Sequence, residues 1–122
     1  MHIIFCERAE NNADGTYSIH RGGLDVYRLE VPGAVRVAAL IETTAEEVPA
    51  GTCVVELEIV DPDGKRVGSL LASATSPEGL RHTRFLLELG FGARAHGRHE
   101  VLVRIGKARG AAAIWVAPPR FS

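Results

Sequence analysis

Residues 53–64 read CVVELEIVDPDG and decide the fold class of this chain. Within this stretch an apolar side chain stands at every second position and alternates with Glu56 and Glu58, so one side of an extended strand is apolar and the other is charged. The Asp-Pro-Asp-Gly that follows is typical of a tight turn, because proline fixes φ and glycine tolerates a positive φ. The stretch therefore predicts a strand over 53–60 that turns into a second strand over 66–74.

The same alternation recurs along the chain, and turn residues such as Asn11–Gly15, Gly22-Gly23 and Pro32-Gly33 separate the runs. No stretch carries an apolar stripe at helical spacing. We therefore predict an all-β fold of about eight antiparallel strands in a two-sheet, immunoglobulin-like sandwich with little or no helix. The predicted inward-facing sets are Ile3 and Phe5; Val35, Val37, Ala39 and Ile41; Val55, Leu57 and Ile59; Thr83, Phe85, Leu87, Leu89 and Phe91; and Val101, Val103 and Ile105.

Length and composition favour a single globular domain over residues 1–122. The chain has 122 residues, of which 46% are hydrophobic and 24% are charged, which is the ordinary globular mixture. No apolar run approaches the roughly 20 residues that a membrane span needs, so we expect no membrane partner. Cys6 and Cys53 fall in strand-like runs and no export signal precedes them, which favours buried free thiols and a cytoplasmic location.

The charge is unevenly distributed, although the net charge is only −1. Residues 1–80 hold 6 basic and 13 acidic side chains, and residues 81–122 hold 8 basic and 2 acidic ones. The near-neutral total makes nucleic acid an unexpected partner. One interpretation of the basic half is an anion-binding surface that contains Arg84, Arg98 and Arg104. The other, which we favour, is that carboxylates such as those of Glu56 or Glu58 neutralise Arg84 or Arg104 across neighbouring strands.

Three histidines are the strongest metal-binding candidates, although the expectation remains that no cofactor is bound. His96 and His99 are three residues apart at the entry to a strand, and His82 could complete a site from a neighbouring strand. However, residues three apart in a strand point to opposite faces. No serine lies in the strand–turn–helix context of a nucleophile elbow, so we expect no catalysis.

Four large apolar residues are candidates for an exposed interface, because they fall on the polar sides of their strands. Trp115 interrupts the inward pair Ile114 and Val116, and an exposed tryptophan is a frequent interface anchor. The alternative for Trp115 is that the tail at 118–121 covers it. The predicted interface residues are Leu40, Leu86, Leu102 and Trp115.

The arrangement of strands and turns resembles a family of short bacterial proteins of unknown function. The features that carry the resemblance are IIFCERA at 3–9, DGTYSI at 14–19, Gly22-Gly23, Pro32 before the third alternating run, VDPDGK at 60–65 and GRHEV at 97–101. The resemblance implies an all-β sandwich without an assigned activity. It implies no catalytic residue.

Two functions are consistent with these observations. The first is a cytosolic module without catalysis that binds a protein partner or itself, as a homodimer, through exposed apolar residues. The alternative is a module that binds a small ligand, an anion or a metal through the arginines and histidines of the C-terminal part. The alternative requires those side chains to converge in one concave site.

Overall fold

The computed structural model describes residues 1–14 and 16–120, and within them every regular element is a β-strand. The all-β class is therefore confirmed, and no described segment forms a helix that could cross a membrane. The strands are β1 (His2–Asn11), β2 (Tyr17–Gly22), β3 (Val26–Arg28), β4 (Gly33–Thr44), β5 (Gly51–Val60), β6 (Arg66–Ser76), β7 (His82–Ala93), β8 (Gly97–Ile105) and β9 (Ala108–Ala117).

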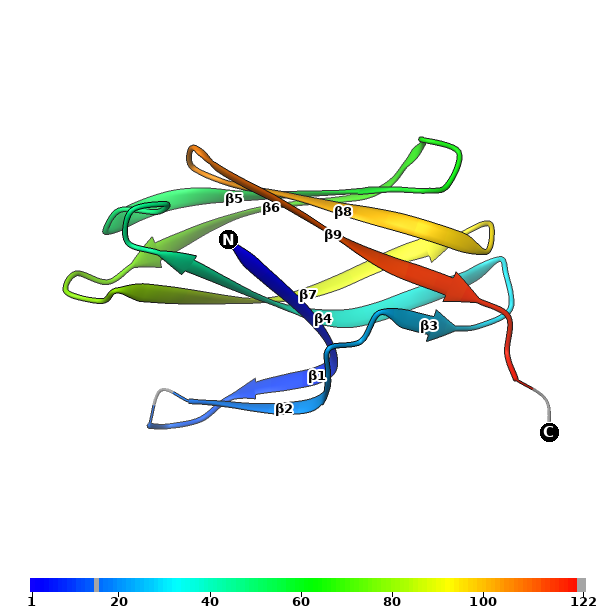
Figure 1. Cartoon of the computed structure of the whole chain (residues 1–122), viewed down its shortest axis with the longest axis horizontal. Coiled ribbons are helices and arrows are strands. Elements are labelled where there is room, and N and C mark those ends of the chain that lie inside the picture. Colours follow the sequence, from blue (N-terminus) through cyan, green and yellow to red (C-terminus); the bar gives the residue numbers. More distant parts are fainter. Residues whose placement is uncertain (15, 121–122) are drawn as a thin grey trace.

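The nine described strands form two sheets, which lie over one another in Figure 1. The four-stranded sheet has the order β2-β1-β4-β7, and the five-stranded sheet has the order β3-β9-β8-β5-β6. All pairs are antiparallel except β3 with β9. The sequence predicted about eight strands, all antiparallel. The difference lies in β3, a short segment that crosses to the second sheet and runs beside the last strand.

One apolar core lies between the two sheets and contains the predicted inward-facing sets. Ile41 from β4, Ile59 from β5 and Ile114 from β9 are 0–1% exposed in it. Leu87 and Ile3 pack at its margin. The alternation therefore predicted correctly which side chains of β1, β4, β5, β7 and β8 face this core.

The Asp61–Gly64 turn joins β5 to β6 as predicted. The Asp61 carboxylate Oδ1 accepts hydrogen bonds from the backbone N–H groups of Asp63, at 2.9 Å, and of Lys65, at 2.8 Å. Gly64 has φ = +84°, a conformation that favours glycine. The turn sets the register of the β5–β6 hairpin, in which Glu56 lies opposite Leu71.

Strand β1 changes partner near its middle, and this curls the four-stranded sheet. His2–Cys6 pairs with β4, whereas Cys6–Asn11 pairs with β2. The resulting β1–β2 hairpin lies beneath β4 and β7 in the view of Figure 1, and the Tyr17 hydroxyl donates a hydrogen bond to the Arg84 carbonyl oxygen at 3.4 Å. Gly15, in the predicted turn of this hairpin, is outside the described residues.

The hairpin covers part of the outer face of the four-stranded sheet, which corrects the interface prediction for Leu40. Leu40 and Leu86 are cross-strand partners on that face, as their positions in the alternation required. Yet Leu40 is only 7% exposed and Leu86 is half-buried. Ala38 and Cys6 beside them are also buried. Because the chain folds back over this face, Leu40 is not an exposed contact residue, and Leu86 is only partly accessible.

Candidate functional site

The outer face of the five-stranded sheet is the candidate functional site, since it presents large apolar side chains to solvent. Leu102 on β8 is 38% exposed and Trp115 on β9 is 51% exposed, both on the side predicted. Val54 on β5 and Leu71 on β6 are 47% and 70% exposed. These four residues come from four adjacent strands, so they are spread across one continuous surface, called here the open face.

The sequence indicated Leu102 and Trp115 but missed Val54 and Leu71. Val54 stands two positions before Glu56, so its side chain points to the same side as that carboxylate. Leu71 directly follows Leu70, and neighbouring side chains in a strand point to opposite faces, so one of the two had to face outward. The exposure of both residues could therefore have been predicted, because each is an apolar residue in an outward-facing position of its strand.

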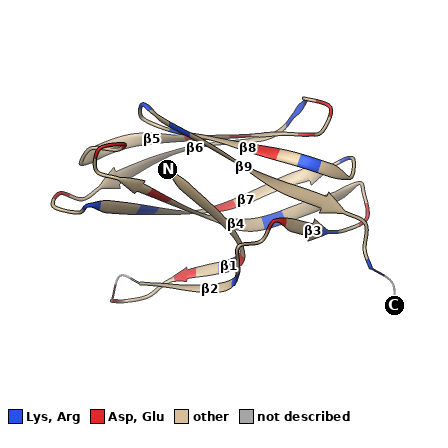
Figure 2. Ribbon diagram, viewed as in Figure 1, with Lys and Arg blue, Asp and Glu red and all other residues tan. Residues whose placement is uncertain are grey.

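Two arginines on the open face form ion pairs with carboxylates of the same face. Arg104 lies directly opposite Glu56 across β8 and β5, and its guanidinium Nη2 donates to the Glu56 carboxylate. Arg98 likewise donates to Glu100, two residues along β8. The predicted cross-strand neutralisation is confirmed for Arg104. Figure 2 shows that basic and acidic residues are interspersed along these strands.

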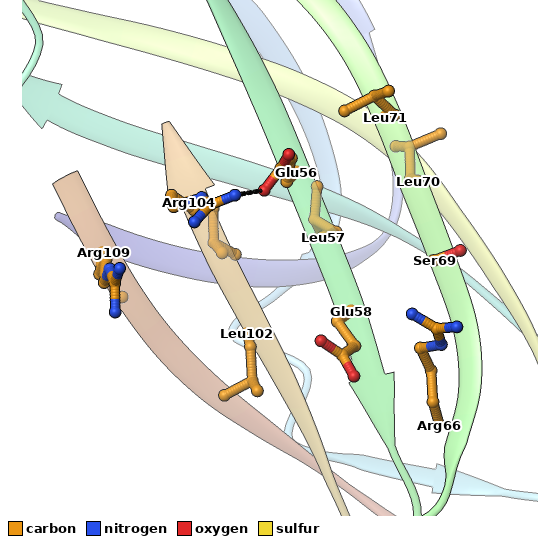
Figure 3. A pocket seen from close by; sticks show the side chains of 12 residues that line it. Glu56, Leu57, Glu58, Arg66, Ser69, Leu70, Leu71, Leu102, Arg104 and Arg109 are labelled. Atoms are coloured by element: carbon orange, nitrogen blue, oxygen red, sulfur yellow. Dashed lines mark hydrogen bonds and ion pairs between the residues drawn. The ribbon is translucent and has the colours of Figure 1, made fainter. Parts of the chain in front are cut away.

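A shallow hollow of about 590 Å³ occupies the middle of the open face. Figure 3 shows Glu58 and Arg66 beside one another in it, with Leu102 opposite and Arg109 at the far margin. Glu58, Arg66 and Arg109 form no ion pair with any described residue. The hollow thus combines one unpaired carboxylate and two unpaired guanidinium groups with the apolar surface of Leu71 and Leu102.

Arg84, the third arginine of the predicted anion-binding surface, lies on the other sheet. It is opposite Glu42 across β7 and β4, and its Nε donates to the Glu42 carboxylate at 2.9 Å. This hydrogen bond holds the pKa of the Glu42 carboxyl below its ordinary value. Arg84, Arg98 and Arg104 are therefore each paired with a carboxylate and do not form one cluster.

The three histidines are not brought together either. His82 begins β7 and His96 follows its end, so the 12 residues of that strand separate them by roughly 35 Å. His96 Nε2 lies 3.0 Å from the Leu29 carbonyl oxygen. His99 is fully buried, with Nδ1 3.1 Å from the Gly97 carbonyl oxygen and Nε2 without a partner in the described chain. No group of three or more candidate metal ligands occurs among the described residues.

Comparison with known proteins does not place the chain in a family. No family model matches the chain, and no curated protein matches it. Among solved structures it is similar to Pseudomonas fluorescens alkylpurine DNA glycosylase AlkC bound to DNA containing an abasic site analog, with 20% sequence identity and a TM-score of 0.41. The match covers 75% of this chain and 27% of the glycosylase chain, so the chain spans well under half of that protein.

Proposed function

We propose that this chain is an interaction module without catalysis, which docks a second copy of itself on the open face; the alternative partner is a different protein. The observation that carries the proposal is the exposure of Val54, Leu71, Leu102 and Trp115 on one side of one sheet. Apolar side chains that share a surface, rimmed by polar ones, are typical of protein contact sites.

The contrast between the two outer faces supports the choice of surface. The apolar row of the four-stranded sheet around Leu40 is covered by the chain's own hairpin, whereas no described segment covers Leu102 or Trp115. The open face also carries charges of both signs, as in the Glu56–Arg104 pair. Two copies can therefore face each other without a large repulsion between like charges.

The alternative of an anion, ligand or metal site has weaker support. It requires convergence of the predicted arginines and histidines. His82 begins β7 and His96 follows its end, and the guanidinium groups of Arg84, Arg98 and Arg104 already bind carboxylates. Binding an anion there would require breaking existing ion pairs.

We also propose that the fold is of the immunoglobulin-like sandwich type. The orders β1-β4-β7 and β9-β8-β5-β6 match A-B-E and G-F-C-C′ of that type. In this assignment the second half of β1 and the β2 strand paired with it are an addition that curls under the first sheet. A cytoplasmic location goes with the proposal and is supported by the free thiols of Cys6 and Cys53. Burial raises the pKa of the Cys6 thiol, which keeps it protonated and unreactive.

Sedimentation velocity over a concentration series tests the docking proposal. We expect Leu102→Lys to raise the dissociation constant of the dimer by about tenfold or more, because a lysine would have to be desolvated in the centre of the interface. Ile19→Lys is the matched control, because Ile19 is 42% exposed on the β1–β2 hairpin, away from the open face. Equal effects of the two substitutions, or a wild-type chain that stays monomeric at all concentrations, would contradict docking between copies.

A further inference from the structure

The first half of β4 has an unpaired edge in the four-stranded sheet. β1 pairs with β4 from His2 to Cys6, and this pairing ends where Cys6 lies opposite Ala38. Beyond Cys6, β1 turns away and pairs with β2 instead, below β4 in the view of Figure 1. Residues 33–37 of β4 are therefore paired with β7 on one side and with no described strand on the other.

The backbone N–H and C=O groups of Ala34 and Arg36 point toward this empty side. The Phe5 carbonyl oxygen accepts a hydrogen bond at 2.8 Å from the N–H of Leu24, which follows β2, so the backbone groups of Phe5 point away from β4. These groups alternate in direction along a strand, so the next residue of β1 directs its own toward Ala38, and Ala38 returns them. Arg36 and Ala34 follow the direction of Ala38, and no described turn or loop backbone group bonds to them.

Glu7 explains why β1 leaves β4. Ile3 and Phe5 face the core, so a straight continuation of the strand would bring Glu7 to the next inward position. Burying an unpaired carboxylate there would be strongly unfavourable. The Glu7 side chain is exposed instead, and its carboxylate pairs with Arg21 Nε at 3.2 Å. The empty side of β4 therefore follows from the sequence of β1.

A hollow of about 580 Å³ lies where the two strands part. Its walls come from residues 7–9 of β1 and residues 34–38 of β4, and residues 88–91 of β7 extend it. The exposed Ala34 and Gly90 add little side-chain bulk at this surface. The hollow therefore has room for a polypeptide main chain alongside β4.

Positive charge flanks the empty side of β4. Arg36 is exposed and forms no ion pair with a described residue. Arg8, on the opposite wall of the hollow, lies 4.0 Å from the Glu10 carboxylate. Glu88 also borders the hollow, but it is on β7, on the far side of β4 from the empty edge. A carboxylate placed beside β4 would therefore meet Arg36 as its cross-strand neighbour.

We propose that the unpaired edge of β4 binds an extended segment of another polypeptide as an added strand, with an acidic side chain opposite Arg36. An added strand is held by main-chain hydrogen bonds to an exposed sheet edge, here those of Ala34 and Arg36, and is selected through its alternate side chains. Opposite charges directly across a strand pair are stabilising, and like charges are destabilising. The remaining side chains of the segment point inward, on the side of Val35 and Val37, and are apolar. This contact is separate from the open face, which belongs to the other sheet.

Amide chemical shifts of the full chain, followed during titration with two soluble peptides of about eight residues, test the proposal. In one peptide valine alternates with glutamate, and in the other valine alternates with lysine. The glutamate peptide is expected to bind at least about tenfold more tightly, because only this peptide places a carboxylate opposite Arg36. The shift changes should centre on Ala34 and Arg36, and hydrogen exchange of these two amides should slow when the peptide is bound.

Three variants separate charge recognition from main-chain pairing. Arg36→Glu is expected to reverse the preference, so that the lysine peptide binds about threefold or more tightly than the glutamate peptide. Arg81→Glu is the matched control, because it reverses an exposed charge just before β7, at the other end of that strand from the hollow, and should leave the preference unchanged. Ala34→Pro removes an N–H that β7 does not use, and should weaken binding of the glutamate peptide by about tenfold with an unchanged far-ultraviolet circular dichroism spectrum.

The outcomes distinguish this contact from docking between copies. A preference for the glutamate peptide that Arg36→Glu reverses, with shifts at Ala34, supports the added strand. Equal affinities for the two peptides, no binding of either, or shifts centred on the open face would overturn it. A chain that self-associates but binds neither peptide loses the added strand and keeps the proposed function, whereas a monomeric chain that binds the glutamate peptide shows the reverse.

Discussion

Leu40→Lys is expected to lower the free energy of unfolding by about 3 kcal/mol or more, whereas Leu102→Lys should change it by less than about 1 kcal/mol. Both leucines occupy outward-facing positions of their strands, so the alternation alone predicts that both side chains are exposed. Leu40, however, is 7% exposed beneath the β1–β2 hairpin, and Leu102 is 38% exposed. A lysine at 40 would lose its hydration or displace the hairpin, while one at 102 would stand opposite Glu58 in solvent.

Urea denaturation followed by far-ultraviolet circular dichroism, at a concentration where the chain is monomeric, measures this difference. The midpoint of the Leu40→Lys variant should fall well below that of wild type, and the Leu102→Lys midpoint should stay close to it. If Leu40→Lys were as stable as Leu102→Lys, the hairpin would not cover the four-stranded sheet. Both outer faces would then be open.

Ile41→Ala is expected to cost about 2–5 kcal/mol of the free energy of unfolding, because it removes buried methyl and methylene groups from the space between the sheets. Ile41 is 0% exposed in the middle of β4. The matched change is Leu71→Ala on the open face, where the side chain is 70% exposed and truncation should cost no more than about 0.5 kcal/mol in the monomer.

Thermal unfolding of the two alanine variants checks this prediction. In a domain of this size, a loss of 1 kcal/mol lowers Tm by several degrees, so Ile41→Ala should melt at least about 8 °C below wild type. Leu71→Ala should melt within about 3 °C of it. Similar melting temperatures for the two variants would contradict a shared core between the sheets.

Much of the fold could be predicted because it depends on local rules. Alternation of apolar and polar residues places Val55, Leu57 and Ile59 on one side of β5 whatever the rest of the chain does. The Asp61–Gly64 turn is likewise encoded in four consecutive residues. The same alternation correctly placed Leu102 and Trp115 on the outward-facing sides of their strands.

What could not be predicted depends on contacts between distant segments. The burial of Leu40 follows from a hairpin that bends back under β4. The residues around position 40 do not predict that this hairpin covers them. The separation of His82 from His96 follows from the length of the strand between them. The parallel pairing of β3 with β9 joins segments about 90 residues apart, and sequence periodicity carries no information about such partners.

The open face as the docking surface is tested most directly by amide chemical shifts of the full chain at rising concentration. We predict that shifts and broadening are confined to β5, β6, β8 and β9, with the largest changes near Leu71 and Leu102. The amides of Leu40 and Ala38 on the covered sheet should stay unchanged. Concentration-dependent shifts centred on β1, β2 and β4, or none anywhere, would contradict the account.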